Sequence, residues 1–389
     1  MDFSPDNISE HDDSLIIDKF TSEKFLPVAV LYGPNGSGKT TVLESIDALI
    51  DRICSFLFIM KSSNETNIQQ STFKSLTDKY HKYDKKCKKL PIKFNIIFKI
   101  ENLTFNYNIA ILEDKITEEN LYLKKAHKDA DIIFERTSQK IYLGEVLEGI
   151  IVNKLNEKMP LLSHLALNYD IEVIKKIINW FFSIQKINYD NPLNTIKAFY
   201  PKTDKQKEQL CKLLRSMGIN VQDVRAEKDS NNQIINVYLK HNINGNLIEI
   251  PFSDESAGTR KVFSLLFRII KAIDKGLLTI IDELDAKLHP QMLQFIIELF
   301  TNPNINKKGA QLIFSSHDMY TMSSDVFRRD EIWFCALNPQ DASTLYSLSS
   351  IKKSNGKKPR KDESYGKQYL EGRYGADPYL KKILNWDET

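Results

Sequence analysis

The chain has few cysteines and no long apolar run. Its 389 residues include four cysteines, which are scattered and form no C-x-x-C pair: Cys54, Cys87, Cys211 and Cys335. This pattern indicates neither a zinc site nor a disulfide framework, and it predicts reduced thiols in a cytoplasmic protein. The apolar stretch 171–184 carries internal lysines and is too short to span a bilayer, so we expect no membrane segment.

Charge of one sign is also scarce. Lys and Arg number 54 against 51 Asp and Glu, which leaves a formal net charge of +3. So small an imbalance gives no whole-chain argument for binding nucleic acid. Residues 1–23 are acidic and polar, unlike a signal peptide. A hydrophobic content of 42% supports a sizeable core, and the length fits two average domains or one large α/β domain with an insertion.

A complete phosphate-loop motif, G-x-x-x-x-G-K-T, occupies residues 33–40. A buried-strand pattern at 28–31 precedes it and helical spacing over 41–50 follows, which is the context that the motif requires. In such a loop, backbone N–H groups at a helix N-terminus hold phosphate oxygens, the lysine reaches the terminal phosphates, and the Thr hydroxyl binds Mg²⁺. The sequence therefore predicts a nucleoside triphosphate site formed by Asn35, Gly36, Ser37, Gly38, Lys39, Thr40 and Thr41.

Two carboxylates follow the apolar run 277–281. The first, Asp282, has the oxygen chemistry that Mg²⁺ prefers, and together with Thr40 it is the predicted metal ligand. The second, Glu283, can polarise the attacking water and is the predicted catalytic base. An Asp-Glu pair at a strand end can also be a solvated turn. The phosphate loop in the same chain favours the functional interpretation.

A histidine ends a further apolar strand. His317 follows the run 312–314 through two serines, and its ring could hydrogen-bond the γ-phosphate or the attacking water. A lone histidine in a loop is usually without function. In this chain the histidine follows a phosphate loop and a strand that ends in Asp-Glu, and it stands at the end of a further strand. This order of motifs favours a catalytic role for His317.

Small residues precede the amphipathic helix predicted at 260–274. Ser256, Ala257 and Gly258 could approach a phosphate closely, and the Ser256 hydroxyl could donate to it. Ser256 could equally be an ordinary helix cap. Both interpretations are open at this point.

Hydrophobic periodicity divides the chain. Alternation over 92–100 and 105–111, with short strands following, predicts an antiparallel β lobe, and the pattern turns helical in the middle of the chain. We therefore predict an α/β fold in which one discontinuous nucleotide-binding domain contains a helical insertion. Its expected parts are the phosphate loop with the β lobe at 1–145, the helical insertion at 146–217, the second part of the domain at 218–350, and a basic tail at 351–389.

The order of these motifs resembles the ABC-type ATPases of the SMC, Rad50 and OLD class. Residues 254–260 stand where that class has its signature motif, residues 284–288 resemble the D-loop with Asp285, and His317 resembles the switch histidine. The resemblance implies an ATPase head with a mixed sheet and an antiparallel β lobe. It also implies that Asp285 belongs to the ATP site. Two heads would sandwich ATP, with Ser256 and Gly258 acting in trans, so the expected unit is at least a homodimer.

A narrower resemblance covers nearly the whole chain. Motifs at 26–28, 255–259, 288–290, 358–363 and 372–376 are similar to compact prokaryotic ATPases of the AAA-15/AAA-21 type. This resemblance implies a switch or sensor in abortive infection or phage defence, acting on a separate effector such as a TOPRIM nuclease or a toxin. The chain departs from the family in two places. Residues 1–23 carry no clear Asn-Phe-Arg-Ser-like motif, and a Q-loop glutamine is assignable only by position, at Gln69 or Gln70.

Lysines crowd two segments, 74–93 and 352–361. Such side chains could contact the phosphates of a nucleic acid, although Lys-rich stretches are usually solvated loops. Once the ATP site has taken Asp282, Glu283 and Asp285, no nuclease constellation remains. About seventy residues follow His317, too few for a fused TOPRIM domain. Cutting of a nucleic acid would therefore fall to a partner.

Two alternative functions are open from the sequence. One is a DNA-repair or maintenance ATPase of the SMC/Rad50 kind, although the predicted insertion lacks the heptad runs of a long coiled coil. The other is an ATP-loaded scaffold that sequesters a toxin and hardly turns over.

Overall fold

The computed structural model describes residues 1–62, 75–125, 130–187, 200–201, 203–352 and 358–376. Several predicted residues lie outside these ranges. They are the Q-loop candidates Gln69 and Gln70, and Lys74, Lys353 and Lys357 of the two basic segments.

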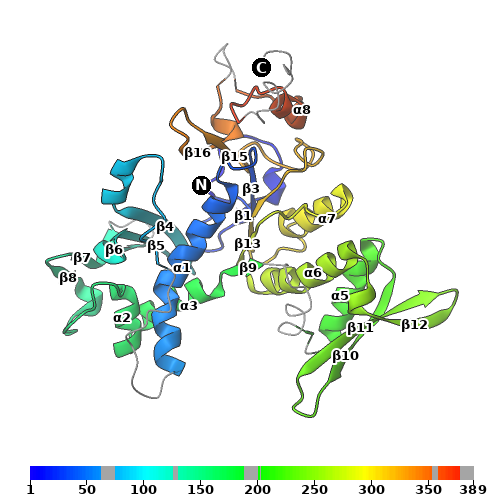
Figure 1. Cartoon of the computed structure of the whole chain (residues 1–389), viewed down its shortest axis with the longest axis horizontal. Helices are drawn as coiled ribbons and strands as arrows, with labels where there is room; N and C mark the ends of the chain where they lie inside the picture. The colour runs from blue at the N-terminus through cyan, green and yellow to red at the C-terminus, as the bar shows by residue number, and fades with distance from the viewer. Residues whose placement is uncertain (63–74, 126–129, 188–199, 202, 353–357, 377–389) are drawn as a thin grey trace, which may run out of the picture.

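A six-stranded mixed sheet forms the centre of the molecule (Figure 1), in the order β16-β15-β3-β14-β13-β9. All neighbouring pairs are parallel except β15 and β16. Every residue of β3 is buried, as expected for a strand inside a parallel sheet. The strands are β3 (Val28–Tyr32), β9 (Gln185–Ile187), β13 (Leu278–Ile281), β14 (Gln311–Ser315), β15 (Ile332–Leu337) and β16 (Ser343–Ser347).

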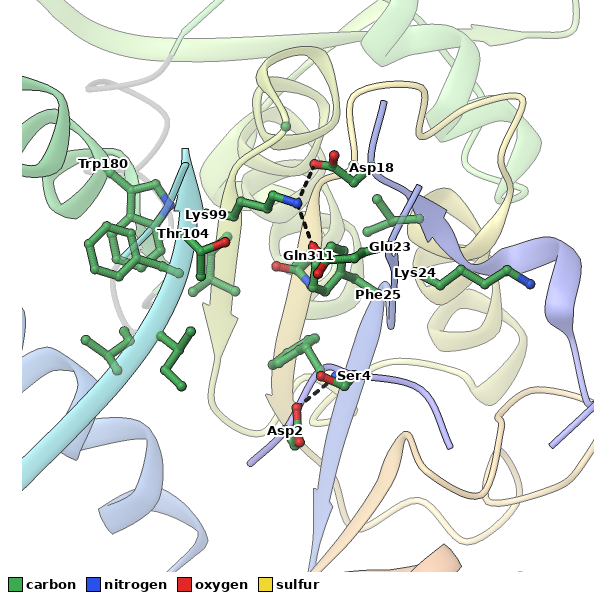
Figure 2. A pocket seen from close by; sticks show the side chains of 18 of the residues that line it. Asp2, Ser4, Asp18, Glu23, Lys24, Phe25, Lys99, Thr104, Trp180 and Gln311 are labelled. Carbon is green, nitrogen blue, oxygen red and sulfur yellow. Dashed lines mark hydrogen bonds and ion pairs between the residues drawn. The ribbon is translucent and has the colours of Figure 1, made fainter. Parts of the chain in front are cut away.

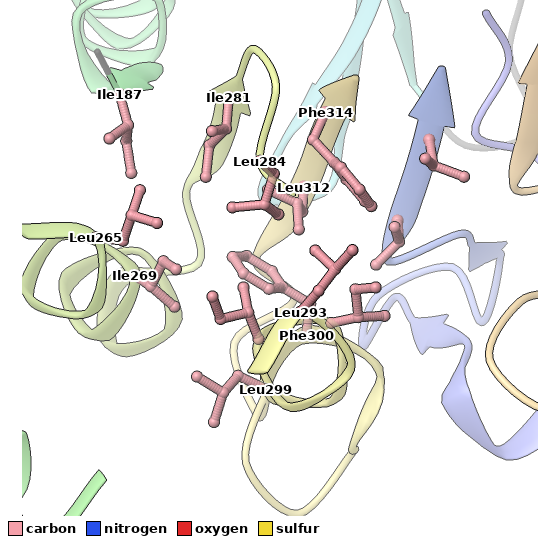
Figure 3. Packing of buried hydrophobic residues seen from close by; sticks show 14 of the residues in the cluster. Ile187, Leu265, Ile269, Ile281, Leu284, Leu293, Leu299, Phe300, Leu312 and Phe314 are labelled. Atoms are coloured by element: carbon pink, nitrogen blue, oxygen red, sulfur yellow. The ribbon is translucent and has the colours of Figure 1, made fainter. Parts of the chain in front are cut away.

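Helices cover both faces of this sheet. On one face, α6 and α7 pack their apolar sides against the strands, and Figure 3 shows side chains of this cluster, among them Leu265 of α6, Phe300 of α7 and Phe314 of β14. On the other face, α1 contributes Leu43 to a smaller cluster with Ile313 of β14. The covering helices are α1 (Lys39–Ser62), α6 (Ala257–Lys275) and α7 (Pro290–Thr301). Two further helices of this part of the fold are α5 (Asp204–Ser216) and α8 (Tyr365–Leu370).

An antiparallel lobe of five strands lies beside α1 (Figure 1), as the alternating pattern predicts. The inner side chains of the lobe form a second core with α1, α2 and α3. The elements are β4 (Ile92–Ile100), β5 (Leu103–Leu112), β6 (Lys115–Lys125), β7 (Ala130–Thr137), β8 (Ile141–Leu143), α2 (Leu161–Asn168) and α3 (Glu172–Ser183).

Two smaller sheets complete the fold. β10 (Val221–Lys228), β11 (Ile234–Ile243) and β12 (Asn246–Pro251) form an antiparallel sheet next to α5. The hairpin between β11 and β12 turns at Asn244 and Gly245, whose φ angles of 52° and 84° suit the Asn-Gly turn. β1 (Ile16–Ile17) pairs with β2 (Lys24–Phe25). Short 3₁₀ helices span Asp12–Ser14, Lys85–Lys89, Glu145–Leu147, Phe252–Asp254 and Leu348–Ser350.

One lysine links the lobe to the N-terminal hairpin. The Nζ of Lys99, on β4, lies 3.3 Å from an Asp18 carboxylate oxygen and 2.7 Å from one of Glu23 (Figure 2). These residues line an open cleft between the lobe and the hairpin. The hydrogen bond from Lys99 lowers the pKa of Glu23. The cleft contains none of the site residues predicted from the sequence.

The segment predicted as a helical insertion, 146–217, is helical only in part. It contains α2, α3 and α5, but also β9, which pairs with β13 at the edge of the central sheet. A three-residue strand is too short to show a period, so the sequence pattern gave no sign of it. The division at residues 145, 217 and 350 stays a prediction. Within the described residues, every helix is too short or too polar to cross a membrane.

Candidate functional site

Three neighbouring strands of the central sheet end at one edge. β14 lies between β3 and β13, and all three are parallel. β3 leads into the phosphate loop, β13 into Asp282 and Glu283, and β14 into His317. The carboxyl ends of parallel strands meet at the same edge, which is where open α/β sheets place their ligands. The structure thus brings together motifs that are far apart in the chain.

Close packing shapes the phosphate loop. Gly33 has a φ of 157°, and a Cβ added there would lie 2.4 Å from the Cys335 carbonyl oxygen. Gly38 has a φ of 102°, and a Cβ added there would lie 2.4 Å from the Ser343 hydroxyl oxygen on β16. Side chains rarely adopt these conformations and would not fit these spaces. The two glycines therefore let the loop lie against β15 and β16.

Lys39 lies folded into this loop. Its Nζ donates to the carbonyl oxygens of Gly33 at 2.8 Å and Pro34 at 3.2 Å. Burial lowers the pKa of Lys39, and the nearby Asp282 and Glu283 oppose that shift. The Ser37 hydroxyl is fully buried and has no hydrogen-bond partner among the described residues. A buried ammonium and a buried unpaired hydroxyl in one loop fit a bound phosphate group.

The rest of the loop faces solvent. Asn35 and Gly36 are exposed at its turn, and Thr40 and Thr41 are exposed in the first turn of α1. That first turn holds no acidic residue, so the partial positive charge of the helix N-terminus is not neutralised locally. The exposed side of the loop is therefore suited to an anionic ligand.

The hydroxyl of Ser315 fixes the Asp282 carboxylate and the backbone of Glu283. It donates to the Asp282 carboxylate and accepts the backbone N–H of Glu283 at 2.7 Å. Asp282 is half-buried and the Glu283 side chain is exposed. Glu283 adopts a φ of 48°, an uncommon conformation for a residue with a side chain. Surrounding hydrogen bonds therefore hold Glu283 in an orientation that the free chain would seldom adopt.

Asp285 connects this loop to His317. One of its carboxylate oxygens accepts the backbone N–H of His317 at 3.1 Å, while the other is buried with no partner in the described part of the chain. The His317 side chain is exposed. Asp285 thus holds the backbone of the predicted switch histidine next to the carboxylate loop. Its unpaired oxygen is available to a further donor.

Ser256 is the N-cap of α6. Its Oγ accepts the backbone N–H of Thr259 at 3.0 Å, so the cap considered from the sequence is present. The residue is nevertheless exposed. Gly258 follows two residues later, where an added Cβ would be 3.4 Å from the carbonyl oxygen of Lys287. The signature-like segment is therefore packed against the loop that follows β13, and its action in trans stays a prediction.

Sequence reasoning missed two residues of this site, Ser315 and Lys261. Lys261, on α6, is 2% exposed, and its Nζ donates to backbone carbonyls of the loop after β13. Burial lowers the pKa of Lys261 to about 8, against the opposing effect of Asp285 and Glu283. The sequence carries one sign that Lys261 is buried. It lies four residues before Leu265, so it stands on the apolar face of the helix.

The oxygen groups present fit Mg²⁺. Thr40 offers a hydroxyl and Asp282 a carboxylate, and a bound triphosphate would supply further oxygens, which is the kind of ligand set that Mg²⁺ takes. Within the described ranges, no group of three His, Cys, Asp or Glu residues forms a metal site from protein alone.

Comparison with protein families identifies the chain. Residues 28–323 match the AAA_21 family, described as "AAA domain, putative AbiEii toxin, Type IV TA system". The chain belongs to this family. The match covers the phosphate loop, the signature-like segment, both carboxylates and His317. It confirms the AAA-21 resemblance, and together with the mixed sheet and the antiparallel lobe it confirms the predicted ABC-type α/β fold class.

The chain is also similar to several solved SMC heads. The SMC head domain from Thermotoga maritima aligns with 86% of this chain and 97% of its own, at 12% identity and a TM-score of 0.35. An Smc head with an extended coiled coil, bound to the C-terminal domain of ScpA and derived from Pyrococcus furiosus, aligns with 84% of this chain and 91% of its own, at 11% identity and a TM-score of 0.35. No curated protein matches the chain.

Proposed function

We propose that this AAA_21 protein binds and hydrolyses ATP between two heads and works as a switch in prokaryotic phage defence. In this role it would control a separate effector, either a nuclease such as a TOPRIM protein or a toxin. The observation that carries the proposal is the meeting of the phosphate loop, Asp282 with Glu283, and His317 at one edge of the sheet.

Each residue at this edge has a task in hydrolysis. Lys39 neutralises charge on the β- and γ-phosphates. Thr40 and Asp282 would hold Mg²⁺, which neutralises further phosphate charge when it is bound. Glu283 orients a water molecule and accepts its proton while the water oxygen attacks the γ-phosphorus and ADP leaves. His317 would hydrogen-bond the γ-phosphate or the attacking water.

The second head would complete the site. Ser256 is exposed at the N-terminus of α6, a helix of 19 residues, and Gly258 adds no side chain two residues further on. A helix N-terminus favours a negative group such as the γ-phosphate. In our proposal the α6 N-terminus of one head contacts the ATP of the other, so the working unit is a homodimer.

The family description supports a role in defence. It names a putative AbiEii toxin and a Type IV TA system, which fits a chain whose output is control over a toxic activity. The proposed location is the cytoplasm, where both ATP and an effector would be available.

A basic segment next to the phosphate loop favours a second candidate, a DNA-maintenance ATPase. The Nε2 of His81 lies 3.3 Å from the Gln340 carbonyl oxygen in the β15–β16 turn. Ser343 of the same hairpin lies beside Gly38, where an added Cβ would be 2.4 Å from the Ser343 hydroxyl oxygen. The lysines around His81 are exposed: Lys79, Lys82, Lys85, Lys86, Lys88 and Lys89. Such side chains can contact nucleic acid phosphates. Binding there would lie close enough to the loop to affect hydrolysis.

A phage challenge combined with an ATPase assay tests the proposed function. Cells would carry the gene with its genomic neighbours, as wild type, Lys39→Ala, Glu283→Gln, or the control Glu298→Gln, whose side chain is exposed on α7. We expect protection and turnover in the wild type and the control, and neither in the two site variants. Protection by Glu283→Gln without turnover would instead support the ATP-loaded scaffold. Turnover that rises several-fold with DNA, without protection, would support the DNA-maintenance candidate.

A further inference from the structure

Lys261 joins the signature helix to the loop that carries Glu283. Its Nζ donates to the carbonyl oxygens of Glu283 at 3.0 Å and Leu284 at 2.9 Å, and also to that of Ala286. An ammonium group has three donor hydrogens, so these carbonyls match its full capacity. A lysine is seldom buried unless its charge is compensated, and here backbone oxygens provide that compensation.

The loop that Lys261 holds has an uncommon backbone. Glu283 has a φ of 48° and Lys287 a φ of 62°. The segment 283–287 therefore has a residue in the left-handed backbone conformation at each end. Such conformations persist only where the surroundings impose them. Ser315 fixes the N–H side of Glu283, and Lys261 fixes its carbonyl side. The two contacts together set the direction in which the Glu283 side chain leaves the backbone.

We propose that Lys261 is a positioning residue that orients Glu283 of its own head for attack by water. This inference rests on the proposed ATPase function. Lys261 touches neither ATP nor water in this role; it acts through the backbone of Glu283. Because Lys261 also belongs to the helix capped by Ser256, the competing possibility is that it acts through the signature segment, on the site of the other head.

The first test separates turnover from binding. Lys261→Met removes the three hydrogen bonds, while Lys275→Met makes the same change at an exposed position near the end of the same helix. We expect Lys261→Met to keep its ATP Kd within about twofold and to lose kcat by up to about 10²-fold, the usual effect of a small misplacement of a catalytic group. Lys261→Arg, which keeps the charge and several donors, should recover part of kcat. Lys275→Met should equal the wild type.

Three outcomes would overturn the inference. They are wild-type turnover in Lys261→Met, loss of ATP affinity in parallel with kcat, and failure of Lys261→Arg to exceed Lys261→Met. Thermal unfolding shows whether each variant is folded at the assay temperature. If Lys261→Met is unfolded, Lys261→Gln takes its place, since its amide still donates to backbone carbonyls.

The second test mixes variants and distinguishes the two heads. In a mixed dimer of Lys261→Met with Lys39→Ala, only the Lys261→Met head has an intact phosphate loop. The site at that loop uses Glu283 of the Lys261→Met head and the signature segment of the Lys39→Ala head. Action through Glu283 predicts no recovery of turnover, and action through the signature predicts recovery. The reference is the mixture of Ser256→Arg with Lys39→Ala, which should recover. If that reference fails, the shared-site proposal fails, while the comparison of kcat with Kd still decides the role of Lys261.

Discussion

The hydroxyl of Ser315, at the end of β14, donates a hydrogen bond to the carboxylate of Asp282, at the end of β13. The same oxygen accepts the N–H of Glu283. A residue on the strand beside the carboxylates therefore sets the geometry of both the predicted metal ligand and the predicted base.

Ser315→Ala should impair both stability and turnover. The change removes the hydrogen-bond partner of the partly buried Glu283 N–H, which costs up to about 1–3 kcal/mol, and it frees the Asp282 carboxylate and the Glu283 backbone to move. We expect kcat to fall about tenfold, corresponding to about 1.4 kcal/mol of barrier. The control is Thr279→Val in β13, which removes a buried hydroxyl that has no hydrogen-bond partner in the described structure. Equal turnover in Ser315→Ala and the wild type would show that this contact does not position the site.

Glu283→Gln should separate ATP binding from hydrolysis. The amide keeps the size of the side chain but cannot accept a proton from water, so turnover should fall by about 10²-fold or more. ATP affinity, measured by calorimetry, should be retained, because Lys39 and the phosphate loop are unchanged. Hydrolysis at the wild-type rate would remove Glu283 from its role as the base.

Lys39→Ala should abolish nucleotide binding. The ammonium is the buried cation of the loop, and in the free protein it donates to the Gly33 and Pro34 carbonyl oxygens, from which it can turn toward phosphates. Calorimetric titration with ATP should show no binding for the variant. An unchanged Kd would contradict the placement of ATP at this loop.

The parts of the site that can be predicted from the sequence are those in which the residues of one segment are enough to indicate its structure. Residues 33–40 fix a strand, a turn and a helix within one motif, and the apolar runs before Asp282 and His317 indicate strands without reference to the rest of the chain. The antiparallel lobe was predictable for the same reason, since alternation over 92–100 is a local property.

What stayed hidden depends on tertiary contacts. Lys261 meets carbonyls that lie 22 to 25 residues further along the chain, and no local pattern encodes that meeting. β9 becomes a strand because β13 offers it an open edge, not because of its own three residues. The pattern of segment 146–217 predicts helix because its periodic stretches outweigh this short strand.

Stability should depend on pH through Glu331, which is 1% exposed and lies directly before β15. Burial raises the pKa of Glu331 to about 8 from its ordinary value of 4.5, and the neighbouring Asp330 adds to the shift. Between these values the folded protein binds more protons than the unfolded chain, so this contribution to stability is present below about pH 5 and is lost as the pH rises to about 8. Glu331→Gln should flatten that part of the profile. Urea-unfolding curves at pH 5, 6, 7 and 8 measure it, and parallel profiles for variant and wild type would contradict the assignment.

Ser256→Arg tests whether the α6 N-terminus serves a second head. If the Ser256 hydroxyl contacts the ATP of the partner head, the variant should bind ATP but fail to form the ATP-dependent dimer or to hydrolyse efficiently. If Ser256 only caps its own helix, as its 3.0 Å bond to Thr259 N–H allows, the change should cost about 1 kcal/mol of stability and leave catalysis intact. Light scattering with ATP and an ATPase assay separate the two cases.

Mixing Ser256→Arg with Lys39→Ala sharpens this test. In the mixed dimer, one composite site carries both lesions, and the other pairs an intact Lys39 with an intact Ser256. Two inactive proteins should therefore regain part of the wild-type turnover when combined, provided that one site can work alone. If Ser256 only caps the helix of its own chain, Ser256→Arg is already active by itself and Lys39→Ala is inactive. Mixing the two proteins would then restore no activity. Full ATPase activity in folded Ser256→Arg alone would exclude the shared site and leave Ser256 as a helix cap.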